Sequence, residues 1–359
     1  MSAGEPFPFL ASLDLPPGWV EAGDRFVASG GTAMILGGTD SGKSTLSRYL
    51  VYRAYAAGEP VGLMDLDLGQ SHVGPPAALG LAAFPPHVPG DDPLFPEELY
   101  FIGQTSPVAA VLEVVVGARV LADAAAARGL TRLVVNTSGL VSGGAAVRLK
   151  RGQVELLRPA LLLALARGEE LAPLVRAVGE AAPLLRLAVS PRAMGKSPEM
   201  RRAYREERFR DYFRAARELR FPWGSVQLRG RFFGEGRRLS RRERQEWAGR
   251  LGVPVLLGEV SALRHLLLVG EAPEPSATRE FPLLHLVAWS SLEYCLAGLL
   301  DGGHRTLAVG IVLPHPWEER LWRILTPLAP ERAGEVRYLN LGRLRLTPEG
   351  RELGPAACP

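Results

Sequence analysis

The sequence is poor in lysine and cysteine, and it has no long apolar run. Only three of its 42 basic residues are lysine, at Lys43, Lys150 and Lys196, and the rest are arginine. Its two cysteines, Cys295 and Cys358, have no paired spacing, which argues against a disulfide framework or a zinc site and favours a reducing compartment. No stretch reaches the roughly 18 apolar residues of a membrane helix, and no signal-peptide pattern opens the chain. We therefore expect a cytoplasmic protein without a membrane span.

The composition is that of a globular protein with a substantial core. The 359 residues are 47% hydrophobic and 22% charged, and this length suits two domains. We expect a short lead-in over residues 1–32, a first domain over 33–221 and a second over 222–359. The net charge of +4 is unevenly spread, since residues 186–220 hold eleven Lys or Arg against five Asp or Glu. Such a run is either a solvated helix face or a binding surface for a polyanion.

Short apolar runs alternate with helical stretches in the first domain. The predicted strands are Ala33–Leu36, Val61–Leu66, Leu99–Ile102, Arg132–Asn136, Ala160–Ala166 and Leu184–Val189. Helices are predicted between them, notably over Lys43–Ala57 and Val108–Arg128. Continuous apolar strands separated by helices favour a parallel sheet that is buried on both faces. The fold class is therefore a doubly wound α/β domain with a mainly parallel sheet.

A basic helix and then a change of pattern follow. Ser197 suits a helix N-cap and Pro198 the first helical position, so we expect a helix within about 190–219. Beyond Pro222 the pattern becomes mainly β. The expected strands are Val226–Phe233, Val255–Val260, Leu292–Leu300, Thr306–Leu313, Val336–Leu341 and Arg343–Leu346. Asp301-Gly302-Gly303 predicts a hairpin turn between the third and fourth of these.

The strongest motif is a phosphate-binding loop at residues 37–44. Gly37-Gly38-Thr39-Asp40-Ser41-Gly42-Lys43-Ser44 follows an apolar strand and opens a helix, as a P-loop requires. Its backbone N–H groups and the helix N-terminus would cradle phosphates, while Lys43 reaches the β- and γ-phosphates and Ser44 ligates Mg²⁺. We therefore expect ATP or GTP with Mg²⁺, bound by Gly38 through Thr45, and no other metal. No Asn-Lys-x-Asp motif occurs, which argues against a GTPase.

Two carboxylates stand where the second predicted strand ends, with Asp65 inside it and Asp67 directly after it. Residues two apart on an extended segment share a face, so Asp65 and Asp67 would both point toward the phosphates. One carboxylate could hold Mg²⁺ and the other could deprotonate an incoming hydroxyl, which is what a kinase needs. The alternative is that both only cap a loop. His72 follows the same loop and either touches a phosphate or the acceptor, or is an ordinary surface residue.

These motifs, in this order, resemble those of the polynucleotide 5′-hydroxyl kinases, the P-loop RNA kinases of pre-mRNA cleavage factor and ribosomal-RNA processing. Beside the P-loop, the resemblance rests on Asp-x-Asp-x-Gly-Gln at 65–70 and on Gly103-Gln104-Thr105-Ser106-Pro107. It rests further on Asn136-Thr137-Ser138-Gly139-Leu140, which looks like the family's clasp, and on 196–213, which looks like its lid. Leu140 stands where the family usually has Trp, and Lys196 where it usually has Arg.

The resemblance implies a role for each motif. Lys43, Ser44 and Thr45 would hold the nucleotide and metal, and Asp67 would be the general base, with Asp65 near the Mg²⁺. On the acceptor side, the implied residues are Gln70, Thr105, Ser106, Thr137, Leu140 and Arg205. Lys196 and Arg201 would close over the phosphates. The implied reaction transfers a γ-phosphate to the 5′-OH of single-stranded RNA or DNA, with a nucleic acid as the partner.

Two other functions fit the same residues. The chain could be an ATP-binding scaffold that does not catalyse, or a P-loop kinase of a small metabolite. Lys150 either contacts nucleic acid or lies on the surface. The tryptophans of the second domain favour core or interface packing over base stacking; they are Trp223, Trp247, Trp289, Trp317 and Trp322.

Overall fold

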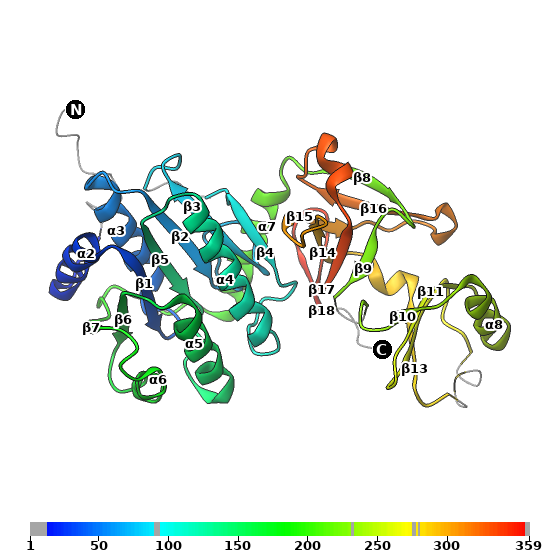
Figure 1. Cartoon of the computed structure of the whole chain (residues 1–359), viewed down its shortest axis with the longest axis horizontal. Helices are drawn as coiled ribbons and strands as arrows, with labels where there is room; N and C mark the ends of the chain where they lie inside the picture. Colours follow the sequence, from blue (N-terminus) through cyan, green and yellow to red (C-terminus); the bar gives the residue numbers. More distant parts are fainter. Residues whose placement is uncertain (1–12, 90–93, 231–232, 275–277, 279–280, 356–359) are drawn as a thin grey trace. The chain divides into compact units, whose positions relative to one another are not determined.

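Seven strands form the sheet of the first part of the chain, in the order β4-β3-β2-β5-β1-β6-β7 (Figure 1). Their bounds are β1 Gly31–Gly37, β2 Val61–Leu66, β3 Ala78–Phe84, β4 Glu98–Phe101, β5 Arg132–Thr137, β6 Leu161–Ala166 and β7 Leu184–Ala188. This computed structural model describes residues 13–89, 94–230, 233–274, 278 and 281–355. Neighbouring strands are parallel except at β3, which is antiparallel to both β2 and β4. The mainly parallel sheet is thus confirmed, with β3 as a strand that the sequence analysis missed.

Helices cover both faces of this sheet. Their bounds are α2 Pro17–Ser29, α3 Lys43–Ala56, α4 Val111–Ala127, α5 Gly143–Leu157, α6 Ala172–Val178 and α7 Pro198–Phe213. Alternate residues of each strand enter two separate apolar clusters. Ile35 of β1 packs in a cluster with α2 and α3, whereas Met34 and Leu36 pack in the cluster that holds α4, α5 and α6. Burial on both faces explains why these strands are continuous apolar runs.

Two expectations at the edges of this region need correction. The segment 1–32 includes helix α2, whose Trp19, Ala22 and Phe26 are buried against α3 and the sheet. Helix α7 ends at Phe213 and does not reach residue 219, because a strand, β8, begins at Arg217. The chain separates into two units, Met1–Asp211 and Tyr212–Pro359, and this division lies inside α7, before the boundary predicted at residue 221.

The second unit is rich in β-structure, as predicted. Its elements are β8 Arg217–Pro222, β9 Gln227–Arg229, β10 Arg237–Arg238, α8 Arg241–Leu251, β11 Val255–Val260, β12 His265–Val269, β13 Leu284–Ala288, β14 Cys295–Leu300, β15 Thr306–Val312, β16 Leu321–Thr326, β17 Tyr338–Leu346 and β18 Glu352–Pro355. Short 3₁₀ helices η2 (Trp289–Leu292), η3 (Trp317–Glu319) and η4 (Pro330–Glu335) lie between strands. Strands β14 and β15 form the antiparallel hairpin expected across Asp301–Gly303.

The unit differs from the prediction in several details, and its strands β8, β10, β12, β13, β16 and β18 were not among those expected. A single strand, β17, replaces the two strands expected over 336–346. The strand expected over 226–233 is shortened to β9, and residues 231–232 lie outside the described part. Helix α8 was not anticipated, although Ser240 and Glu243 form a capping box at its start.

Among the described residues, the buried Cys295 forms no disulfide, and its thiol donates to the backbone oxygen of Ser291 (3.6 Å). Cys358 lies outside the described residues. Within the described ranges, no helix is both long enough and apolar enough to cross a bilayer.

Candidate active site

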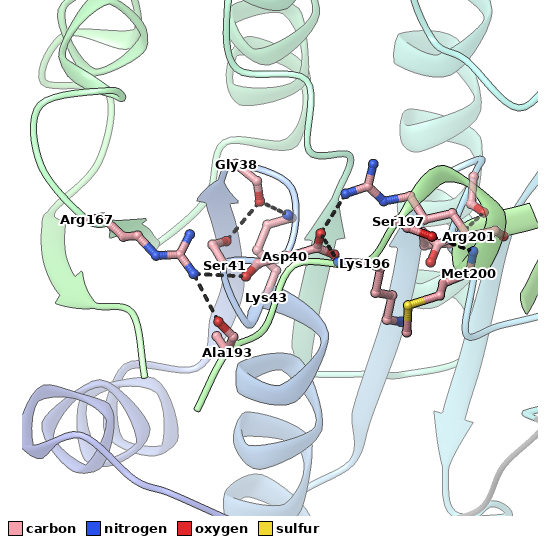
Figure 2. A network of polar contacts seen from close by, with 12 residues as sticks. Gly38, Asp40, Ser41, Lys43, Arg167, Ala193, Lys196, Ser197, Met200 and Arg201 are labelled. Atoms are coloured by element: carbon pink, nitrogen blue, oxygen red, sulfur yellow. Dashed lines mark hydrogen bonds and ion pairs between the residues drawn. The ribbon is translucent and has the colours of Figure 1, made fainter. Parts of the chain in front are cut away.

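The P-loop joins the end of β1 to the start of α3. Gly42 has a φ of 91°, a backbone conformation that suits glycine, and it directly precedes the first helical residue, Lys43. The Lys43 ammonium donates a hydrogen bond to the carbonyl oxygen of Gly38 (2.6 Å), and the Ser41 hydroxyl donates to the same oxygen (3.0 Å; Figure 2). Burial lowers the pKa of Lys43, against the opposing effect of nearby carboxylates, of which Asp67 is the strongest. The loop therefore holds one buried cation at the helix N-terminus, where phosphates bind.

A cavity of about 280 Å³ lies beside this loop. Its lining comes from the P-loop, from the loop after β2 and from the segment before α7, namely Thr39–Thr45, Asp67, Gln70, His72, Ala193, Met194 and Lys196. Sequence motifs that are separated by more than a hundred residues thus meet at one cavity. Seven of the eight residues predicted to bind nucleotide line it, together with the predicted base Asp67.

The Asp67 carboxylate is held by the loop that it begins. Its Oδ1 atom accepts hydrogen bonds from the backbone N–H groups of Gly69 (3.0 Å) and Gln70 (3.1 Å). Within the described ranges, its Oδ2 atom has no hydrogen-bond partner. One oxygen therefore fixes the carboxylate, and the other is available at the cavity.

Asp65 lies deeper than the prediction placed it and does not line the cavity. It is 1% exposed, and its Oδ1 accepts from the backbone N–H of Asp67 and from the Asn136 side chain, both at 3.0 Å. Its Oδ2 accepts from the backbone N–H of His72 (2.6 Å). Burial, together with the nearby negative charge of Asp67, raises the pKa of Asp65 to about 7, although these hydrogen bonds act in the opposite direction. Asp65 thus organises the loop that carries Asp67.

The clasp segment at the end of β5 packs directly against the P-loop. A Cβ atom on Gly139 would lie 2.7 Å from Oγ1 and 2.9 Å from the backbone N of Thr39, so only glycine fits here without movement. Thr137 is fully buried and donates to the carbonyl oxygen of Ile35 (2.7 Å), and Leu140 packs against the apolar cluster under α4 and α5. The structure therefore brings the clasp backbone to the P-loop, but Thr137 and Leu140 do not line the cavity.

The sequence left open that Lys150 lies on the surface, but the structure places it in the interior. It is fully buried on α5, and its ammonium donates to the backbone oxygen (2.9 Å) and the hydroxyl (3.3 Å) of Ser138. Burial, with a smaller contribution from the positive charge of Lys43, lowers the pKa of Lys150 to about 7. All three lysines of the chain therefore gather around one site, since Lys43 and Lys196 line the cavity and Lys150 holds the clasp.

The segment before α7 and the first turn of that helix contact the P-loop through Asp40 (Figure 2). The Asp40 Oδ2 atom accepts from the backbone N–H of Lys196 (2.9 Å) and from the Arg201 guanidinium (2.6 Å). Although partial burial acts to raise it, the pKa of Asp40 is lowered by these two hydrogen bonds and by both positive charges. The Ser197 hydroxyl accepts from the backbone N–H of Met200 (3.2 Å), in agreement with an N-cap.

Further contacts tie this lid to the site. The Gln70 side chain donates to the backbone oxygen of Arg201 (3.3 Å), and the Tyr204 hydroxyl contacts His72 Nδ1 (3.1 Å). Arg167, which the sequence analysis missed, donates to the backbone oxygens of Asp40 (3.4 Å) and Ala193 (3.2 Å). It directly follows β6, the parallel neighbour of β1, and the carboxyl ends of neighbouring parallel strands meet at one edge of the sheet.

The remaining predicted acceptor residues lie outside the cavity wall. Thr105 is half-buried, and its backbone oxygen lies close to Gly69 of the Asp67 loop, whereas Ser106 is exposed. Arg205 is half-buried on α7. Among the described residues, no group of three or more His, Cys, Asp or Glu side chains could hold a metal ion.

Sequence comparison with known proteins decides the family. The family described as "mRNA cleavage and polyadenylation factor CLP1 P-loop" matches residues 37–215. The polyribonucleotide 5′-hydroxyl-kinase of Thermococcus kodakarensis is 31% identical over 331 residues, which are 90% of each chain. The chain belongs to this family.

Further relatives support the assignment of the chain to this CLP1-type family. The polyribonucleotide 5′-hydroxyl-kinase of Pyrococcus abyssi is 30% identical over 321 residues, or 89% of each chain, and that of Methanocaldococcus jannaschii is 26% identical over 89% of this chain and 88% of its own. Among solved structures, Clp1p in its complex with Pcf11p matches 91% of this chain and 79% of its own with a TM-score of 0.59 at 13% identity, which supports the fold. The cavity therefore lies beside the P-loop of a CLP1-type protein, a family that implies nucleotide binding.

Proposed function

We propose that this chain is a polynucleotide 5′-hydroxyl kinase that transfers the γ-phosphate of ATP to the 5′-OH end of RNA. The observation that carries the proposal is that the P-loop lysine, Lys43, and a carboxylate with an available oxygen, Asp67, line the same cavity. A nucleotide-binding scaffold needs the first of these groups but not the second. The relatives named polyribonucleotide 5′-hydroxyl-kinase over nine-tenths of the chain support this acceptor.

In the proposed reaction, Asp67 is the general base. Its Oδ2 atom takes the proton of the 5′-hydroxyl, the hydroxyl oxygen bonds to the γ-phosphorus, and the bond from that phosphorus to the β–γ bridging oxygen breaks. ADP leaves with the bridging oxygen, and the proton on Asp67 returns to solvent. Lys43 and the backbone N–H groups of the P-loop bind the phosphates and stabilise the charge on the transferred group.

The oxygen donors at the cavity suit magnesium. Ser44 and Thr45 offer hydroxyl oxygens and Asp67 a carboxylate, and Mg²⁺ prefers oxygen ligands and keeps several waters. We assign Ser44 as the direct ligand. Asp65 is bonded through both oxygens, so we propose that its part in metal binding is to position the Asp67 loop. Magnesium, when bound, would neutralise phosphate charge.

We propose that the lid supplies the remaining positive charge. Lys196 lines the cavity, and Arg201 is paired with Asp40 of the P-loop itself. A triphosphate in the loop would offer Arg201 several anionic oxygens in place of one carboxylate. Arg201 would then pass from Asp40 to the transferred group, so that lid closure and charge stabilisation occur together.

For the acceptor, Gln70 is the proposed contact that lies at the cavity. Thr105 and Ser106 follow β4 near the Asp67 loop, and Arg205 lies on the lid helix, so these three remain proposed contacts of the strand beyond its 5′ end. The contributions of Thr137 and Leu140 would be indirect. Thr137 holds the end of β5, and Leu140 anchors the clasp in the core.

The test is phosphate transfer from γ-labelled ATP to matched 5′-OH RNA and DNA oligonucleotides, with GTP as a second donor. Asp67→Asn should lower kcat by about 10² to 10⁴, the usual contribution of a general base, with ATP affinity retained. Asp123→Asn, an exposed carboxylate on α4 paired with Arg119, is the matched control and should keep full activity. Full activity in Asp67→Asn would refute the assignment of the base. ATP binding without transfer to any acceptor would favour the scaffold.

A further inference from the structure

A second cavity lies within the C-terminal unit and has no part in the proposed reaction. Its volume is about 480 Å³, larger than that of the P-loop cavity. It is lined by one side of α8, the entry to β11, η3 with the residue after it, and the residue after β8, namely Arg241, Arg244, Gln245, Ala248, Pro254–Leu256, Trp317, Arg320 and Trp223. Four separate segments of this unit therefore meet at one hollow.

The charged groups of this wall are all cationic. Arg241, Arg244 and Arg320 line it with the amide of Gln245, and no carboxylate is among the described residues of the lining. Arg244 donates to the backbone oxygen of Leu256 (2.6 Å), while its Nε atom is buried and has no partner in the described part of the chain. Arg241 and Arg320 are exposed and form no ion pair within 4.0 Å among the residues that the structure describes.

Three arginines close by in the sequence are paired with a carboxylate: Arg237 with Glu243 at 2.6 Å, Arg242 with Glu246 at 2.9 Å and Arg323 with Glu218 at 2.8 Å. Arg238 and Arg250 form no ion pair among the described residues, but they do not line the cavity. The cavity therefore differs from its surroundings in bringing three unpaired guanidinium groups to one wall, and such a cluster favours an anionic ligand.

The cavity also presents two indole rings held in fixed positions. Trp223 donates from its Nε1 to the backbone oxygen of Leu321 (3.2 Å), and its ring lies 5.6 Å from that of buried Trp289. Trp317 packs so closely on Gly270 that a Cβ there would lie 2.9 Å from the indole. Both rings are only partly buried, unlike Trp289 and Trp322. Rigid, partly exposed indoles beside guanidinium groups are the groups on which nucleobases stack.

We propose that this cavity binds a nucleotide unit of a single-stranded polynucleotide, with the phosphate on Arg241, Arg244 and Arg320 and the base against Trp317 and Trp223. The proposal takes the identity of the polymer from the proposed function, since the kinase acceptor is such a strand. It makes the cavity a second contact for the body of the acceptor, separate from the site that holds the 5′ end. Acceptors long enough to occupy both sites should bind more tightly than short ones.

The experiment uses the full-length chain and a fluorescent single-stranded RNA of 20 nucleotides that carries a 5′-phosphate and therefore cannot accept another. Binding is followed by anisotropy at several salt concentrations. Arg241→Glu should weaken binding by about tenfold and lower the slope of log affinity against log salt by about 0.7 for each lost phosphate contact. Arg242→Glu is the matched control, because it makes the same charge change one residue along the same helix outside the cavity. It should weaken binding less than about twofold.

A second readout separates this inference from the proposed function. In transfer assays, Arg241→Glu should raise KM for a 5′-OH 20-mer. With a 5′-OH dinucleotide as the acceptor, both kcat and KM should stay unchanged. Trp317→Leu should also lower oligonucleotide affinity without changing the salt slope, since stacking is not ionic. If neither the wild type nor any variant phosphorylates RNA while Arg241→Glu still loses binding, the kinase proposal fails and the binding site stands.

Three results would overturn the proposed site. Equal losses in Arg241→Glu and Arg242→Glu would show that only general surface charge matters. Unchanged affinity in both Arg241→Glu and Trp317→Leu would remove the cavity from binding altogether. Displacement of the RNA by poly-glutamate as readily as by unlabelled RNA would show that the cavity takes anions without recognising nucleotides.

Discussion

Removal of the buried lysine under the clasp should change how stability depends on pH. Lys150 is fully buried, and burial lowers its pKa from 10.5 in the unfolded chain to about 7 in the folded one. Between these two values the unfolded chain binds a proton that the folded chain does not. The free energy of unfolding therefore rises with pH across this window. Below pH 7 both states carry the proton, and the dependence vanishes.

The expected magnitude follows from the same linkage. Each pH unit well inside the window contributes about 1.4 kcal/mol, so the wild type should gain about 2 kcal/mol between pH 7 and 9 relative to Lys150→Met. The methionine keeps the apolar stem of the lysine but has no proton to release. Taking the difference between the two proteins removes the contribution of every other titrating group.

The assay is denaturant unfolding at pH 7, 8 and 9. Hydrogen exchange of the β5 amides serves as the probe that reports on the first unit. Lys196→Met is the matched control, because Lys196 is exposed, and it should run parallel to the wild type. Parallel curves for Lys150→Met and the wild type would refute the reasoning. They would mean that the ammonium keeps its proton in the folded protein.

Three further outcomes test other contacts. Gly139→Ala should weaken ATP binding by about tenfold and destabilise the first unit by about 1–3 kcal/mol, because its Cβ would overlap Thr39 of the P-loop; unchanged ATP affinity by calorimetry would contradict this. Asp40→Asn tolerates the positive φ of residue 40 but weakens the ion pair with Arg201, so limited proteolysis of the ligand-free protein should cut the lid faster; equal rates would contradict this contact. Hydrogen bonds from two arginines lower the pKa of Glu218 to about 2. The wild type should therefore be more stable than Glu218→Gln above pH 4.5, and this difference in stability should fade as pH falls through 2. A urea midpoint difference that stays constant with pH would contradict this prediction.

Most strands of the first unit were predictable from their continuous apolar runs, and elements with mixed signals were not. β3 reads Ala-Leu-Gly-Leu-Ala-Ala-Phe and lacks the β-branched residues that mark a strand. α2 begins with Pro17 and carries Trp19, Ala22 and Phe26 at helical spacing, a signal that the Pro- and Gly-rich setting concealed. β8 alternates buried and exposed residues from Leu219 onward, so period two ends the basic helix earlier than its charge run indicates.

The site was predictable at the level of motifs and less so at the level of side chains. The alternation that placed Asp65 and Asp67 on one face applies only within a strand, and β2 ends at Leu66. Asp67 therefore enters the loop, whereas Asp65 stays in the sheet and its charge is buried. The burial of Lys150 could have been read from its place among Ala146, Leu149 and Val154 on one face of α5. Contacts such as Arg201 with Asp40 depend on tertiary structure and have no local signal.

The transfer reaction is tested by incubating the wild type with γ-labelled ATP, Mg²⁺ and a 5′-OH RNA oligonucleotide and then digesting the product with a nuclease. All label should be recovered on the 5′-terminal nucleotide. An oligonucleotide with a 5′-phosphate should take up none, and Asp67→Asn should lose the transfer while it still binds ATP. Label on any other position would contradict transfer to the 5′-hydroxyl, and full transfer by Asp67→Asn would contradict Asp67 as the general base.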